Sequence, residues 1–175
     1  MTDYIASPLS RNDIRCIARN VRATFNLDDK HRFPVLEFLE AMPDIFAEKE
    51  FAFEIVDDGE LPSSVQGVTD VANHHMRIKQ SVYDGAYRGS GRDRFSIAHE
   101  IAHYLLMSIF GFAFQRNFAG REVKPYEDPE WQADCLAGEL LVPYHLVSSW
   151  SVEQIANVCG VSVPAAATQK RAFEK

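Results

Sequence analysis

The stretch RFSIAHEIAHYLLM, residues 94–107, decides how the rest of the chain is interpreted. Its apolar residues recur at helical spacing, but His99, Glu100 and His103 interrupt them. In an α-helix, positions four apart lie ~40° apart around the axis and ~6 Å along it, so the two imidazoles can reach one metal ion. Glu100 lies beside that face, where its carboxylate can act as a general base. The pattern predicts a metal site carried by one buried helix.

Chance explains this pattern poorly. With six His and thirteen Glu in 175 residues, random shuffling gives His-Glu-x-x-His about 0.015 times per chain. The structural alternative is that both histidines are satisfied core residues. Two His and one Glu left unpaired in an apolar helix are costly, however, which favours the metal site. Zinc is the default ion for these ligand types, and they also accept manganese or iron.

A catalytic zinc site needs a third protein ligand and an open fourth position. The segment PEWQADCLAGELLVP, residues 129–143, predicts a second helix, on which Glu130 and Asp134 share a face with the small residues Ala137 and Gly138. We expect Glu130 to complete the coordination and Asp134 to accept a hydrogen bond from one ligand histidine. The alternative third ligands are Glu127, Asp128 and Glu139.

Length, charge and cysteine content narrow the class of protein. A chain of 175 residues suits one domain. The net charge of −7 and the pI near 5.3 argue against broad binding to nucleic acid or anionic membranes. The longest apolar stretch, residues 97–114, carries polar interruptions and is not expected to cross a bilayer, and no secretory signal is predicted. The three cysteines are odd in number and widely spaced, which predicts a reducing compartment and a cytoplasmic protein.

The remaining chain predicts helices around a small sheet. Ser10 and Asp13 form a partial capping box for a first helix, and a short helix is expected over 34–42, with Pro43 just after its end. Alternating apolar residues and turn signals predict three strands, near 51–55, 65–71 and 76–82. Residues 83–94 are interpreted as a loop, and the helix with the histidines is expected to begin near Asp93 or Arg94.

These elements predict an α+β fold with a small, mostly antiparallel sheet packed on helices. We expect a single domain over residues 1–175. Its parts are a helical segment at 1–45, the sheet and metal-site helices at 50–143, and a C-terminal helical pair at 150–175.

The two metal-site segments are similar to a known family. RDRFSIAHEIAHYLL and EWQADCLAGELLVP resemble the ImmA/IrrE family of HExxH zinc metallopeptidases, and two flanking segments, MRIKQSVYDGA and SVEQIANVCGVSVPAAATQKR, resemble it more weakly. The resemblance covers roughly residues 50–172 and implies a gluzincin-like fold. By motif, it assigns His99, His103 and Glu130 as zinc ligands and Glu100 as the catalytic residue. Departures from the family pattern at Gln132, Cys135 and Leu136 leave these four positions intact.

The resemblance implies an intracellular, regulatory metalloendopeptidase that cleaves a helix-turn-helix repressor protein. The competing hypothesis is a metal-stabilised binding module that sequesters a repressor or an antitoxin-like partner without cutting it. Glu100 favours the enzyme, because structural zinc needs no such carboxylate. Candidates for stabilising the oxyanion are Tyr83, Tyr126, Tyr104 and His145. The segment 76–82 is interpreted as an edge strand that holds the substrate peptide.

The tail at 154–162 has the spacing of a helix-turn-helix, but it is interpreted as structural. A DNA-reading helix carries polar or basic residues at its start, whereas the second helix here opens with Val163, Pro164 and Ala165. We therefore expect a helical pair that covers the core or contacts a partner, with no direct binding of nucleic acid. Arg92, Asp93 and Arg94 are expected to cap the start of the histidine helix and to solvate its entrance.

Overall fold

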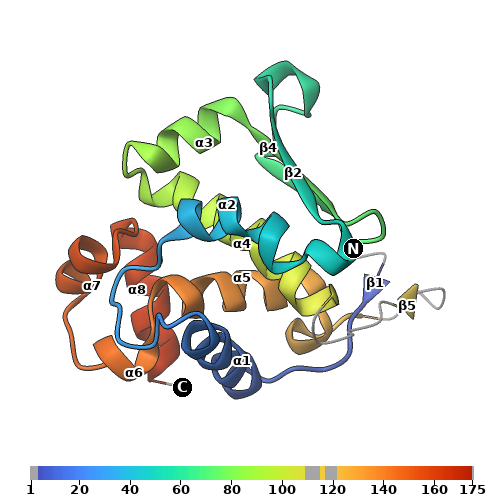
Figure 1. Cartoon of the computed structure of the whole chain (residues 1–175). Helices are drawn as coiled ribbons and strands as arrows, with labels where there is room; N and C mark the ends of the chain where they lie inside the picture. Colours follow the sequence, from blue (N-terminus) through green and yellow to red (C-terminus); the bar gives the residue numbers. More distant parts are fainter. Residues whose placement is uncertain (1–3, 109–114, 117–121, 175) are drawn as a thin grey trace.

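Two helices that pack on each other lie at the centre of the molecule. The computed structural model describes residues 4–108, 115–116 and 122–174. Helix α4 (Gly91–Ser108) packs along α5 (Pro129–Leu141), and Figure 1 shows α1 (Arg11–Thr24) on one side of this pair and the three-stranded sheet on the other. No helix in the described part of the chain is long and apolar enough to cross a membrane.

The sheet is mixed and not mostly antiparallel, although the α+β class is confirmed. Its order is β2 (Ala52–Val56), β4 (His75–Lys79) and β3 (Gly67–Asp70). β4 pairs in parallel with β2 and antiparallel with β3. The connection after β2, which includes the 3₁₀ turn η2 (Asp58–Glu60), carries the chain to the far edge before it returns to the centre. β1 (Tyr4–Ile5) and β5 (Gln115–Arg116) form a separate antiparallel pair.

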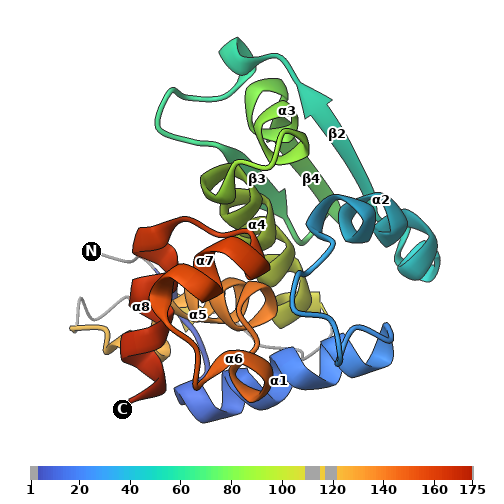
Figure 2. The same cartoon turned by 90° about the vertical axis from the view of Figure 1, so that its left-hand side faces the viewer.

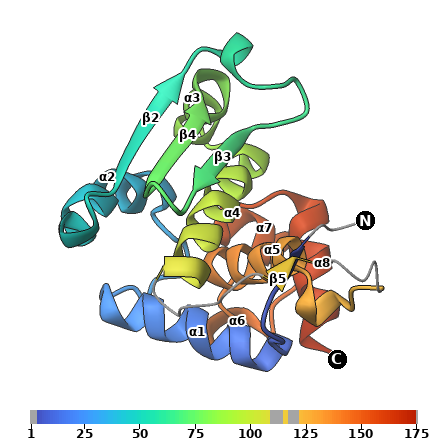
Figure 3. The same cartoon turned by 90° about the vertical axis from the view of Figure 1, so that its right-hand side faces the viewer.

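The edge strand near the histidine helix is β3, so the interpretation of 76–82 as an edge was wrong. β4 is central, and Met76 and Ile78 are buried. The chain then turns directly into α3 (Gln80–Tyr87), which occupies part of the segment expected to be a loop, and α4 begins at Gly91. Burial of Val82 and Ala86 fixes α3 on the core. Figure 3 shows β3 beside α4.

The N-terminal helices follow their predicted signals, with one correction. Ser10 and Asp13 form the capping box of α1. α2 (Val35–Ile45) has Pro34 at its N-cap, but Pro43 lies inside its last turn and does not end it. The N–H of Phe46 still reaches the Met42 carbonyl at 2.9 Å, so the turn closes around the proline. The 3₁₀ turn η1 (Ala47–Lys49) follows.

The C-terminal helices cover the core beside α1 and α5. They are α6 (Tyr144–Val147), α7 (Val152–Cys159) and α8 (Val163–Phe173), and Figure 2 shows them gathered below the sheet. Ile155, Cys159 and Ala166 are fully buried, which explains the apolar character of this pair.

Arg94 does not solvate the entrance to α4 as expected. It is buried, and its guanidinium donates to the Phe33 carbonyl at 2.7 Å and to the Gly160 carbonyl at 3.1 Å. It therefore connects the start of α4 to the segment before α2 and to the end of α7. A buried guanidinium requires such acceptors, and only the packed fold brings these two carbonyls to it.

Candidate metal centre

The two histidines lie on the face of α4 that is not used by the core. Ile97, Ala98, Ile101 and Ala102 are fully buried on the other faces of the helix. The His99 and His103 side chains are 19% and 15% exposed. Helical spacing therefore does what the sequence predicted: it directs both imidazoles from one rigid element toward α5.

Glu130 comes to this face because of how α5 begins. Asp128 is the N-cap, and its side chain accepts the Glu130 N–H at 3.0 Å, while Pro129 occupies the first turn. Glu130 Oε2 lies 3.2 Å from His99 Nε2 and 3.4 Å from His103 Nε2. Among the described residues, these three side chains form the one group of His, Cys, Asp or Glu whose ligand atoms all lie within 4.8 Å of one another.

The spacing of these atoms fits a single zinc ion. The two histidine Nε2 atoms are 2.9 Å apart, so all three atoms point toward a common centre. Ligands at ~2.0–2.1 Å from a tetrahedral zinc are about 3.3 Å from one another. Two neutral imidazoles and one carboxylate are also a common donor set for catalytic zinc, with one position left for water. The residues present therefore fit the ion.

Asp134 orients His99 from behind. Its Oδ1 accepts a hydrogen bond from His99 Nδ1 at 2.8 Å, which turns Nε2 toward the other two ligand atoms. Burial lowers the pKa of His99, but hydrogen bonds to Asp134 and Glu130 outweigh it and raise this pKa to about 10. Hydrogen bonds from His103 and His99 hold the pKa of Glu130 far below its usual range. The metal-free centre therefore favours positive charge: it holds a proton on His99, which a dication can replace.

Glu100 is held by a residue that the sequence analysis missed. Thr69 Oγ1, on β3, donates to Glu100 Oε2 at 2.7 Å and lies 3.2 Å from the Glu100 carbonyl oxygen. A Cβ on Gly67 would come within 2.9 Å of Glu100 Cγ, so glycine is what lets the strand lie this close. No motif marks Thr69, because only the order of the strands places it over α4.

A cleft of about 520 Å³ opens over the group. One wall is the edge strand with the residues before it, including Val65, Val68 and Thr69. The other wall holds His99, Glu100, His103, Met107 and Glu130. The three candidate ligand residues and the expected general base therefore share one solvent-accessible space beside an edge strand.

Two of the four oxyanion candidates have partners elsewhere. Tyr104 is fully buried, with its hydroxyl 3.1 Å from His74 Nδ1. Tyr83, on α3, donates its hydroxyl hydrogen to Glu40. Packing and these contacts hold both side chains in place.

The other two candidates also lie outside the cleft. His145 Nε2 is 2.9 Å from the Asp28 carbonyl oxygen. Tyr126 belongs to the 3₁₀ turn η3 (Pro125–Glu127) and is 39% exposed. Since the described cleft lining includes none of the four, the structure does not bring an oxyanion donor from this set to the metal group.

The alternative third ligands are placed differently from Glu130. Asp128 caps α5, and the Glu127 carbonyl accepts the N–H of Ala6 at 2.8 Å. Glu139 is 1% exposed and pairs with Arg15, whose Nη2 is 3.1 Å from Glu139 Oε1. Geometry therefore favours Glu130.

Comparison with known proteins finds one matching family. The family of the IrrE N-terminal-like domain, Peptidase_M78, matches residues 68–168, which is more than half of the chain and includes α4 and α5. Searches of curated proteins and of solved structures gave no match. The match contains all four residues of the predicted HExxH site, His99, Glu100, His103 and Glu130, and confirms the resemblance seen in the sequence. The chain belongs to the family of the IrrE N-terminal-like domain, a family of metallopeptidase type.

Proposed function

We propose that the protein is a zinc-dependent endopeptidase. His99, His103 and Glu130 are its metal ligands and Glu100 is its general base. The observation that carries this proposal is the convergence of three ligand atoms, 2.9–3.4 Å apart, in an open cleft that also holds Glu100. Manganese or iron can take the place of zinc at such a donor set.

The chain's own groups divide the work of peptide hydrolysis. His99, His103 and Glu130 would hold the zinc ion, which would act as a Lewis acid toward water and the peptide carbonyl. Glu100 accepts the proton of the attacking water and delivers it to the leaving amine nitrogen. The Thr69 hydroxyl restrains Glu100 Oε2, and Asp134 holds the His99 ring with Nε2 toward the centre. Both contacts hold these side chains in place before the reaction, so less conformational freedom is lost in reaching the transition state.

The substrate is an extended segment of a protein. β3 is an edge strand, paired with β4 on one side, and its other side borders the cleft. A peptide added along this edge passes directly over Glu100, because Thr69 of the same strand contacts that carboxylate. A linker of a helix-turn-helix repressor whose backbone is not already hydrogen-bonded can pair with β3 in this way. Cleavage of such a repressor would give the enzyme a regulatory role. The three free cysteines agree with a cytoplasmic location.

The test compares newly formed protein N-termini in bacterial cells that express the wild type or Glu100→Gln, with zinc or manganese added. Glutamine keeps the shape of the side chain and removes the base. We expect new termini in one or a few proteins with the wild type alone. Glu48→Gln, an exposed glutamate of η1, is the matched control and retains the wild-type termini.

The absence of new termini would support the competing hypothesis, a metal-stabilised binding module that does not cut its partner. If no new termini form although both proteins are folded and metal-loaded, and both co-purify with the same partner, the protein holds that partner without cutting it. Identical termini with the wild type and Glu100→Gln would contradict the assignment of the base.

A further inference from the structure

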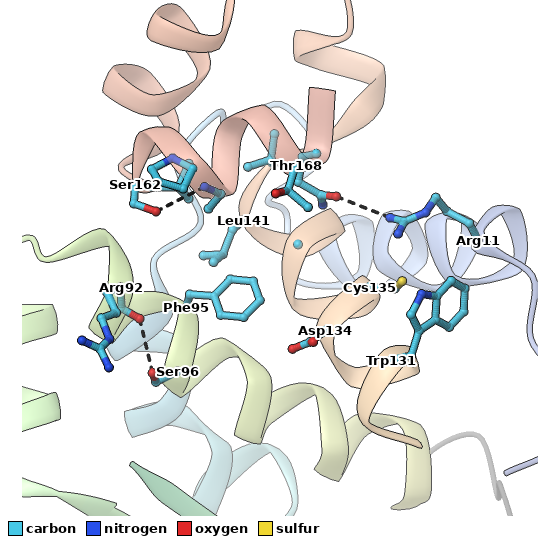
Figure 4. A pocket seen from close by; sticks show the side chains of 16 residues that line it. Arg11, Arg92, Phe95, Ser96, Trp131, Asp134, Cys135, Leu141, Ser162 and Thr168 are labelled. Carbon is cyan, nitrogen blue, oxygen red and sulfur yellow. Dashed lines mark hydrogen bonds between the residues drawn. The ribbon is translucent and has the colours of Figure 1, made fainter. Parts of the chain in front are cut away.

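A second cavity lies behind the metal centre, between α4, α5 and α8. Its volume is about 540 Å³, within the range of small-molecule sites. Figure 4 shows Phe95 and Leu141 in its middle and Trp131 on the side of Arg11. Most of the wall is apolar, so the cavity suits the carbon skeleton of a ligand.

One cationic side chain lies at one end of this cavity. It is Arg11, which is 27% exposed and lies 5.6 Å from the centre of the Trp131 ring. Its Nη1 is 3.4 Å from Gln169 Oε1 and 3.9 Å from Glu139 Oε1. Glu139 has a closer partner in Arg15, at 3.1 Å. The Arg11 guanidinium therefore has only long polar contacts among the described residues.

Gln169 of α8 holds Arg11 at this end of the cavity. Its Oε1 accepts the hydrogen bond from Arg11 Nη1, and the residue is 6% exposed. Its Nε2 is buried against α5, where a Cβ at Gly138 would come within 2.2 Å. Ligand recognition at this end therefore depends on Arg11.

The acidic group of the cavity limits the charge of that ligand. Asp134 also lines it and is the carboxylate that contacts His99. Figure 4 shows Asp134 apart from Arg11, across the cavity wall formed by Trp131 and Cys135. An anionic group is therefore favoured at the Arg11 end and repelled beside Asp134. The second guanidinium of the lining, Arg92, is exposed and lies on the side of the cavity away from Arg11.

We propose that this cavity binds a small organic monocarboxylate with an apolar body. The carboxylate accepts hydrogen bonds from the Arg11 guanidinium, and the apolar body packs on Phe95, Trp131 and Leu141. Charge-assisted hydrogen bonds to a guanidinium are the usual means of carboxylate recognition. This site is separate from the cleft over Glu100 and does not depend on the protein being a protease.

The experiment measures calorimetrically the binding of 1-naphthylacetate and of its uncharged amide, 1-naphthylacetamide, to the full chain. We expect the carboxylate to bind at least tenfold more tightly than the amide. Arg11→Met reduces the affinity of the carboxylate to that of the amide. Arg19→Met is the matched control, because Arg19 lies on the same helix with its side chain 62% exposed, and this variant binds as the wild type does.

A second pair of variants locates the ligand. Ala165→Trp fills the cavity from α8 and removes binding of both compounds, with Thr168→Trp as the substitute if thermal unfolding shows that the first variant is not folded. Glu100→Gln binds as the wild type does, which separates this site from the proposed catalytic cleft. The proposal is overturned if neither compound binds, if the amide binds as tightly as the carboxylate, or if binding persists in Arg11→Met and in the tryptophan variant.

Discussion

Helix α5 carries one glutamate near each end, and the fold places them in opposite environments. Glu130, in the first turn, has a side chain that is 61% exposed and lies against His99 and His103. Glu139, near the last turn, is 1% exposed and faces Arg15 of α1. Hydrogen bonds from the two histidines hold the pKa of Glu130 far below its usual range. Burial raises the pKa of Glu139, although Arg15 opposes this.

The difference shows that residue type alone does not decide which carboxylate binds a metal. An ion needs ligands that converge and a route for water, and the first end of α5 offers both. At the other end the carboxylate is enclosed, and its charge is compensated by a guanidinium from α1. Glu130 is therefore expected to determine metal affinity, and Glu139 to determine stability.

The largest effect is expected from Glu130→Gln. Loss of even an outer-shell partner costs 10- to 100-fold in metal affinity, so loss of a ligand should lower zinc affinity by more than about 100-fold. Glu139→Gln should leave zinc affinity unchanged. Titration with zinc against a competing chelator measures both. Equal affinities for the wild type and Glu130→Gln would show that another residue completes the centre.

Arg15→Met tests the other end of the helix. Breaking a buried ion pair costs 3–5 kcal/mol; because the Arg15 side chain is 23% exposed, we expect the free energy of unfolding to fall by about 2 kcal/mol at pH 7. The loss should shrink toward pH 4, since the raised pKa of Glu139 lets this carboxyl become neutral there. Denaturant unfolding at the two pH values measures it, with Arg19→Met as control. A loss that is the same at both pH values would mean that packing of Arg15 on Tyr144, and not charge, is responsible.

The pH dependence of zinc binding follows from His99. With a pKa of about 10 in the metal-free protein, His99 is protonated at pH 7, and zinc has to displace this proton. Apparent zinc affinity should therefore rise about tenfold per pH unit between pH 7 and 9. In the metal-free protein the same shift stabilises the fold fully below a pH of about 6.5, and this contribution is lost as the pH rises through about 10. Chelator competition at three pH values measures the slope, and a flat profile would contradict it.

The smallest effect is expected from Asp134→Asn. Asparagine can still accept the hydrogen bond from His99 Nδ1 but carries no charge, so zinc affinity should fall by about tenfold. Titration with zinc against a competing chelator measures this loss of affinity. A loss as large as that of Glu130→Gln would make Asp134 a direct ligand and would require a different arrangement of α5.

Features that depend on neighbours along the chain could be predicted from the sequence. The capping box at Ser10 and the proline-initiated start of α5 are local, and so is the four-residue spacing of the two histidines. Glu130 was expected as a ligand because it shares a helix face with Asp134, but its contact with His99 and His103 also requires that α5 pack along α4. The parallel pairing of β2 with β4 could not be predicted, because the chain after β2 crosses to the far edge of the sheet before it returns to the centre.

The sequence by itself determined the kind of chemistry: two imidazoles and a glutamate on one helix, because a helix repeats every ~3.6 residues whatever surrounds it. Only the tertiary structure decided which other groups reach them. Thr69 meets Glu100 because β3 is the edge strand beside α4, and Glu139 is enclosed because α1 brings Arg15 to it. Such contacts join residues that are 31 and 124 positions apart, and they form only when burial of the shared apolar core brings those elements together.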